Sequence, residues 1–302
     1  MAKRKILLGL FGLACLWTAV NLYRTYSWPA EPARPSAENG VWLGHRWLTP
    51  QSDVTQLAAR VEQHGLGYLF VHAGPLDWQG KVAALPGEWD GLAQLRRHCP
   101  ETQIYAWLGG LNADFLGQAE DTVDLSSSRV RANIVATGRR LVEAGFDGIH
   151  YDLEPVREGD SNFLALLRES REAGLLVSVA TPQVRPQGLP LPQLWSQDYY
   201  IRVGGLVDQV VLMGYDTCQP SQDLYTRYLA YQTHQVGTVS CQFLLGLPTY
   251  DDNAPYHNPA HETLAAGLAA AGPADGVAIY AYWTTTESDW TLIDDGRRKS
   301  RQ

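Results

Sequence analysis

From residue 41 onward, short runs of apolar and β-branched residues alternate with longer stretches whose apolar positions recur at helical spacing. The short runs predict strands at 41–43, 67–72, 104–108, 148–153, 175–180, 209–215, 243–247 and 277–282. The longer stretches predict helices near 52–63, 89–98, 128–144, 161–173, 191–203, 222–235 and 261–271. Strands that alternate with helices, without a break in composition, predict an α/β fold: a parallel (β/α)8 TIM barrel over residues 41–295.

The glycines that follow the predicted helices, and the turn after the first strand, favour this barrel over an open, doubly wound sheet. Gly145, Gly174 and Gly272 follow predicted helices, where glycine commonly ends a helix. The first strand is followed by LGHRW at 43–47 and not by the glycine-rich turn that binds dinucleotides in open sheets. In a TIM barrel the functional groups lie at the C-terminal ends of the strands, so those ends are where candidate residues are sought.

The N-terminal segment has the pattern of a membrane signal. Lys3, Arg4 and Lys5 precede the 18 uncharged residues Ile6 to Tyr23, and no A-x-A-like cleavage site follows. This predicts an uncleaved transmembrane anchor at 1–25, with the N-terminus in the cytoplasm and the bulk of the chain outside. A cleaved signal peptide and secretion is the alternative, and lipidation at Cys15 is a third. Residues 26–40 read as a proline-rich linker, and 296–302 as a basic tail.

Composition narrows the function classes. With 45% hydrophobic and 19% charged residues, the chain of 302 residues is too apolar for a disordered protein. Its formal charge of −8 argues against a nucleic-acid partner. Cys218 and Cys241 fall at opposite ends of neighbouring predicted strands, too far apart for a disulfide. The oligomeric state is left open.

The fourth predicted strand carries the sharpest chemical signal, in the segment DGIHYDLEP at 147–155. Side chains at alternate positions of a strand share one face, so His150, Asp152 and Glu154 point the same way. Two carboxyl groups about 7 Å apart in a barrel interior push the pKa of one of them upward, and a raised carboxyl pKa suits a general acid. The alternative is a structural polar network or an exposed strand end.

Other strand ends supply weaker candidates. His45 and His72 end the first two strands, but no third ligand at a suitable spacing accompanies them, so no metal site is predicted. Trp107, Met213 and Tyr250 lie at or just after the ends of later strands and are candidate substrate-binding residues.

Together these motifs resemble the family 18 glycoside hydrolases, which are chitinase-like. Asp147, Gly148, Asp152 and Glu154 match the family's D-G-x-D-x-D-x-E, and His150 stands where the family has its central Asp. MGYD at 213–216 is similar to the family's M-x-Y-D, and Trp283 is similar to the tryptophan that floors its sugar site. Weaker parallels are Gly109-Gly110 and GLPTY at 246–250.

The resemblance implies a hydrolase that cleaves β-linked N-acetylhexosamine glycans, of the chitinase or endo-β-N-acetylglucosaminidase type. The substrate's own acetamido oxygen would be the nucleophile, so no cofactor is implied. Glu154 would be the general acid and base, and Asp152 would hold the acetamido N–H. Tyr215 would donate to the acetamido oxygen, Asp216 would support Tyr215 or bind the sugar, and Trp283 would stack beneath the sugar.

Three points stay open in the sequence. His150 either hydrogen-bonds Asp152, which would alter the pH dependence, or merely fills the core. A chitinase-like lectin without turnover is the rival function, and a carboxylate hydrolase that acts on sugars without an acetamido group is a second. The glycan itself is undetermined: chitin, peptidoglycan, an exopolysaccharide and an N-glycan core all fit.

Overall fold

The computed structural model describes residues 2–298, except 35, 52, 83–89, 114–121, 187, 189–190, 192 and 253. Its strands are β1 (Asn39–Leu43), β2 (Leu66–Pro75), β3 (Gln103–Asn112), β4 (Thr122–Val123), β5 (Gly148–Glu154), β6 (Val177–Thr181), β7 (Gln209–Met213), β8 (Gln242–Pro248) and β9 (Gly276–Tyr280). The strand order is β2-β1-β9-β8-β7-β6-β5-β3, and a further pairing of β2 with β3 closes the ring. All of these pairings are parallel, so the predicted eight-stranded barrel is confirmed.

Strand β4 was not predicted and lies outside the ring. It pairs in parallel with the end of β3, where Leu111 and Asn112 face Thr122 and Val123. Two residues are too few to show an alternating pattern in a sequence. Two predicted strands also end earlier than expected: β7 stops at Met213 and β9 at Tyr280.

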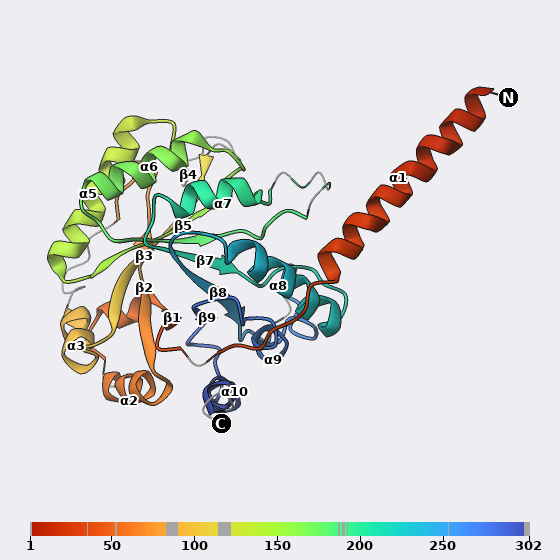
Figure 1. The fold of residues 1–302 in the computed structure, drawn as a ribbon. Coiled ribbons are helices and arrows are strands. Elements are labelled where there is room, and N and C mark those ends of the chain that lie inside the picture. Colours follow the sequence, from red (N-terminus) through yellow and green to blue (C-terminus); the bar gives the residue numbers. More distant parts are fainter. Residues whose placement is uncertain are drawn as a thin grey trace.

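Helices surround the ring (Figure 1). They are η1 (His45–Leu48), α2 (Val54–His64), α3 (Asp90–His98), α5 (Ser128–Ala144), α6 (Ser161–Glu172), α7 (Gln197–Gly204), α8 (Gln222–Val236), α9 (Leu264–Leu268) and α10 (Glu287–Arg298). Each of the seven predicted helices overlaps one of these. Helix α9 is shorter than predicted because Thr263 caps its start by accepting from Ala266 N. This leaves residue 262 outside the helix.

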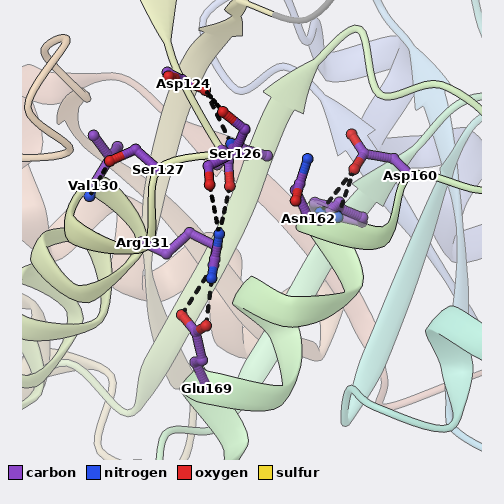
Figure 2. Close-up of polar contacts among 10 residues, drawn as sticks. Asp124, Ser126, Ser127, Val130, Arg131, Asp160, Asn162 and Glu169 are labelled. Atoms are coloured by element: carbon purple, nitrogen blue, oxygen red, sulfur yellow. Dashed lines mark hydrogen bonds and ion pairs between the residues drawn. The ribbon is translucent and has the colours of Figure 1, made fainter.

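Local polar contacts explain where α5 and α6 begin and how they are joined (Figure 2). Ser127 caps α5 by accepting from Val130 N, and Asp160 caps α6 by accepting from the backbone of Asn162 and Phe163. Arg131 of α5 reaches Glu169 of α6 with an N–O distance of 3.0 Å. These two helices flank β5, so the contacts hold the layer behind the strand that carries the candidate acid.

The barrel has an aromatic interior and an aliphatic outer layer. Trp42, Tyr68, Phe70 and Tyr105 point inward and pack together with small aliphatic side chains from β7, β8 and β9. The residues that alternate with them, such as Ile149 and Tyr151 of β5, are buried against the helices. Large rings below the strand ends fill the barrel, so the open end of the ring is the place where a ligand can enter.

Asp147 belongs to this framework. Its Oδ2 accepts from Ile104 N at 2.6 Å, and its Oδ1 lies 2.6 Å from Arg96 Nη2. Asp208 and Asp275 accept from the backbone of the neighbouring strand in the same way. The first aspartate of the DGxDxDxE-like motif is therefore one member of a repeated device that fixes the starts of the strands.

The N-terminal helix α1 (Ala2–Tyr26) projects away from the barrel, and its C-terminal end lies near α8 (Figure 1). Tyr26 donates to Gln219 Oε1 at 2.8 Å, and the chain that follows runs along the barrel, where Gly272 N donates to Glu31 O. Among the residues that the structure describes, no helix is both long enough and apolar enough to cross a membrane. The anchor at residues 1–25 stays a prediction.

Candidate functional site

A cavity of about 630 Å³ opens at the C-terminal end of the barrel. Five of the predicted site residues line it: Asp152, Glu154, Met213, Tyr215 and Asp216. The remaining lining residues are Leu111, Pro155, Pro182, Gln183, Gln193, Leu194, Tyr256, His257 and Tyr280. Residues from six barrel strands or the loops after them therefore meet in one place, at the strand ends where the sequence analysis sought the site.

Strand β5 presents the two carboxyl groups. Trp107, on the neighbouring strand β3, donates its indole N–H to Asp152 Oδ2 at 2.8 Å. Asp152 Oδ1 is buried and has no hydrogen-bond partner among the described residues. One oxygen of this carboxyl group is thus held by the barrel, while the other is buried without a partner among the described residues. Trp107 itself does not line the cavity, so it contacts Asp152 and not the space above it.

Both carboxyl groups have raised pKa values. For Glu154, whose side chain is exposed at the cavity, the main cause is partial loss of hydration, followed by the negative charges of Asp152 and Asp216. Burial also raises the pKa of Asp152, and the hydrogen bond from Trp107 opposes that rise. Loss of hydration disfavours the charged form of a carboxyl group, and a neighbouring carboxylate adds to that effect. Glu154, which receives both effects, is the group better suited to carry a proton at neutral pH.

His150 lies beneath the site and is fully buried. Trp42 Nε1 donates to its Nε2 at 3.2 Å, and its Nδ1 lies 2.8 Å from Ser178 Oγ. Ser178 donates onward to Gln209 Oε1, so the Nδ1 of His150 must carry the proton. Both ring nitrogens are engaged, and the predicted hydrogen bond between His150 and Asp152 is not formed.

Burial lowers the pKa of His150 to about 3, which keeps the ring neutral. The polar chain continues from Gln209 to Gln242, whose side-chain amide donates to Glu38 at the opposite end of the barrel. The position that holds an aspartate in the resembled family thus holds here an uncharged link in a buried polar network. Of the two readings of His150, the structure supports the core residue.

The loop after β7 presents Tyr215 and Asp216. Gln183 fixes the backbone there by donating to the carbonyl oxygens of Met213 and Tyr215 at 2.8 and 2.9 Å. Tyr215 is buried, which raises its pKa well above the ordinary value and keeps the hydroxyl protonated. Asp216 has a positive φ of 55°, and its Oδ1 accepts from Tyr250 at 3.0 Å. Burial raises the pKa of Asp216 as well.

The aromatic ring that the eighth barrel strand supplies is not the predicted one. Tyr280, the last residue of β9, lines the cavity and stacks on Tyr215 with the ring centroids 5.1 Å apart. Trp283 is 55% exposed and lies edge-on to Tyr280, outside the cavity lining. The difference arises because β9 ends two residues earlier than predicted. Tyr280 lies two residues after Ala278, which faces inward, so both side chains are on the same face of the strand. This spacing is the signal that could have identified Tyr280.

The remaining candidates lie around the cavity. Tyr250 supports Asp216 from below without lining the space. His45 Nδ1 lies 3.1 Å from the backbone oxygen of His72. Within the described part of the chain, no three His, Cys, Asp or Glu residues are arranged to hold a metal ion. Cys218 and Cys241 are free, as predicted.

Four functional candidates were missed: Gln183, Tyr256, His257 and Glu262. They come from loops, where no alternating pattern shows which way a side chain points. His257 stacks on Tyr250 with the ring centroids 3.7 Å apart, and its Nδ1 contacts Asp252. Glu262 is buried against the loop after β7. Only the folded chain brings these segments to the cavity.

No family model and no curated protein matches the sequence. The fold, however, is similar to that of solved chitinases and of a spore cortex-lytic enzyme. A chitinase from Chromobacterium violaceum ATCC 12472 superposes with a TM-score of 0.61 at 16% identity, over 86% of this chain and 99% of that one. The spore cortex-lytic enzyme SleL of Bacillus megaterium QM B1551 has a TM-score of 0.61 at 14% identity, over 89% of this chain and 76% of that one. The Group IV chitinase of Ostrinia furnacalis has a TM-score of 0.60 at 16% identity, over 86% of this chain and 99% of that one.

Proposed function

We propose that this protein is a glycoside hydrolase that cleaves β-linked N-acetylhexosamine glycans by a substrate-assisted, retaining mechanism. The observation that carries the proposal is the meeting of Asp152, Glu154, Tyr215 and Asp216 in one cavity at the C-terminal end of the barrel. These residues come from two motifs that resemble the family 18 glycoside hydrolases. The chitinase-like folds of the superposed structures support the same class.

Each group suits one step. Glu154, with its raised pKa, is protonated near neutral pH and donates to the leaving glycosidic oxygen. Once it has lost that proton, it accepts one from the attacking water. Asp152 has an oxygen without a partner among the described residues, which can accept from the acetamido N–H and stabilise the positive charge that develops on the acetamido group. Tyr215 keeps its proton and donates to the acetamido oxygen.

The placement of the two carboxyl groups favours the substrate as nucleophile. Asp152 and Glu154 are two residues apart on β5 and share one strand face. A protein nucleophile must approach the sugar from the face opposite the acid, which two groups on one strand face do not readily do. The acetamido oxygen of the substrate supplies that attack from within the sugar, held by Asp152 and Tyr215. An Ostrinia furnacalis chitinase has been solved in complex with allosamidin, which makes that compound a natural probe of this site.

The test is turnover of the full chain on β-1,4-linked N-acetylglucosamine oligomers, beside Glu154→Gln. The parent is expected to release shorter oligomers, and Glu154→Gln is expected to abolish release while still binding them. Equal turnover of oligomers that lack the acetamido group would contradict substrate assistance. Binding without turnover in the parent would identify the protein as a chitinase-like glycan-binding protein.

We also propose that the barrel is extracytoplasmic, because Lys3, Arg4 and Lys5 precede a long uncharged run. Anchoring by residues 1–25 and release after cleavage are the two forms of this proposal. Fractionation of cells that express the full chain distinguishes them, since the anchored form sediments with membranes and the released form does not. Recovery in the cytoplasm would contradict both.

A further inference from the structure

Glu262 is a buried carboxylate that does not line the cavity. It lies two residues before α9, and only 2% of it is exposed. Its Oε2 accepts from Asp216 N at 2.7 Å and from the Tyr250 hydroxyl at 3.1 Å. Its Oε1 accepts from Thr217 N at 2.8 Å and from Thr217 Oγ1 at 2.7 Å. Each oxygen thus receives two donors, and all four contacts come from the two loops beside the cavity.

The contact with the β7 loop has a particular geometry. Two consecutive backbone N–H groups, those of Asp216 and Thr217, converge on one carboxylate, which is the arrangement of a backbone anion site. Asp216 takes a left-handed conformation with a φ of 55°. A non-glycine residue keeps such a conformation only where its surroundings over-determine it. The Glu262 carboxylate holds the N–H groups of Asp216 and Thr217, while Gln183 holds the carbonyl oxygens of Met213 and Tyr215.

The same carboxylate also sets the surroundings of the Asp216 side chain. The Tyr250 hydroxyl lies 3.0 Å from Asp216 Oδ1 and 3.1 Å from Glu262 Oε2, and it has a single proton to share between them. The titratable groups that act on Asp216 from its own loop and the next one are Tyr250, His257, Glu262 and Asp252. From the neighbouring elements they are Glu154, Tyr215, Tyr225 and Tyr280. Glu262 therefore acts on Asp216 through both its backbone and its side chain.

We propose that Glu262 is a positioning residue that holds Asp216 at the cavity, by anchoring the backbone of residues 216–217 and the hydroxyl of Tyr250. Its effect on turnover rests on the proposed glycosidase function, because Asp216 supports Tyr215 in that reaction. Its effect on the conformation of Asp216 does not depend on that function. The two effects give two independent measurements.

The first measurement is the kinetics of Glu262→Gln in the full chain. A glutamine has one acceptor oxygen, and its NH2 group would face donors, so the four contacts cannot all be kept. A displacement of a reacting group by about 1 Å can cost about 100-fold in rate. We expect kcat to fall by about 100-fold with little change in KM, because Glu262 does not line the cavity and its loss displaces Asp216, which supports Tyr215 in the transition state.

The pH profile provides a readout that a merely structural role would leave in place. The negative charge of Glu262 helps to raise the pKa of Asp216, and the hydrogen bond from Tyr250 lowers it. In Glu262→Gln the charge is lost and Tyr250 can donate fully to Asp216. Both changes lower the pKa of Asp216, so the part of the pH–rate profile that follows its ionisation shifts to lower pH. Glu287→Gln is the matched control, because Glu287 is the exposed first residue of α10 and pairs with Arg60 of α2, and it is expected to retain the parental profile.

The second measurement is a crystal structure of Glu262→Gln, in which Asp216 is expected to leave the left-handed region. Glu262→Asp keeps the carboxylate on a side chain that is shorter by one methylene, so its kcat is expected to lie between those of the parent and Glu262→Gln. It replaces Glu262→Gln in both measurements if that variant does not fold. A lowered melting temperature with parental kcat, pH profile and Asp216 conformation in either variant would overturn the proposal. If the parent lacks turnover, the proposed function fails, and the conformation of Asp216 still decides the role of Glu262.

Discussion

Replacing Trp107 with phenylalanine is expected to raise the pKa of Asp152 and shift the acidic limb of activity to higher pH. The indole N–H of Trp107 donates to Asp152 Oδ2 at 2.8 Å, and this contact lowers the pKa of that carboxyl group. Phenylalanine keeps an aromatic ring beside His72 but has no donor. In the described part of the chain, neither oxygen of Asp152 would then have a hydrogen-bond partner.

The size of the effect follows from the charge on the acceptor. A hydrogen bond to an ionised group contributes about 1.5–3 kcal/mol, and about 1.4 kcal/mol corresponds to one pKa unit. Complete loss of the contact would therefore raise the pKa of Asp152 by about one to two units. Water that enters through the cavity replaces part of the lost contact, so we expect a shift of about one unit.

The assay is kcat/KM against pH on a fluorogenic N-acetylglucosamine oligomer. Ionised Asp152 is needed to hold the acetamido group, so the acidic limb of Trp107→Phe should lie about one pH unit above that of the parent. Trp28→Phe is the matched control, because Trp28 lies against His234 of α8 and far along the chain from β3. An acidic limb that stays in place in Trp107→Phe would refute the reasoning that Trp107 controls the ionisation of Asp152.

Three further predictions concern stability and substrate contact. The raised pKa of Glu154 means that its ionisation favours the unfolded chain, so the parent loses stability as pH rises above 4.5; Glu154→Gln should therefore gain melting temperature over the parent between pH 4.5 and 8, and a constant difference would contradict this. The lowered pKa of His150 has the opposite sign, because the unfolded chain takes up a proton below pH 6.5 that the folded chain refuses until about 3. His150→Leu should be less stable than the parent at pH 7, and urea unfolding should show that deficit shrinking by up to about 1.4 kcal/mol per pH unit toward pH 3. Finally, Tyr280→Ala should reduce kcat/KM more than Trp283→Ala, since Tyr280 lines the cavity. The reverse order in steady-state assays would show that Trp283 is the ring that contacts the sugar.

The barrel was predictable because its signals are local. Each strand is a short apolar run between amphipathic helices, and each such run was found in the closed ring. Periodicity also assigned the faces of β5 correctly, since Ile149, Tyr151 and Leu153 are buried in the outer layer while Asp152 and Glu154 line the cavity. What periodicity could not place were strand ends, because a strand stops where its neighbour stops pairing. That error of two residues in β9 moved the expected aromatic floor from Tyr280 to Trp283.

The sequence by itself determined the parallel barrel and the residues on its strand ends, because alternation along a strand decides which side chains face inward. Only the tertiary structure decided what those side chains contact. Trp107 meets Asp152 across a strand pairing, His150 meets Trp42 and Ser178 and not its neighbour in sequence, and Glu262 reaches Asp216 from a distant loop. Hydrogen bonds depend on positions within a few tenths of an ångström, and closure of the ring is what brings residues from separate segments to those positions.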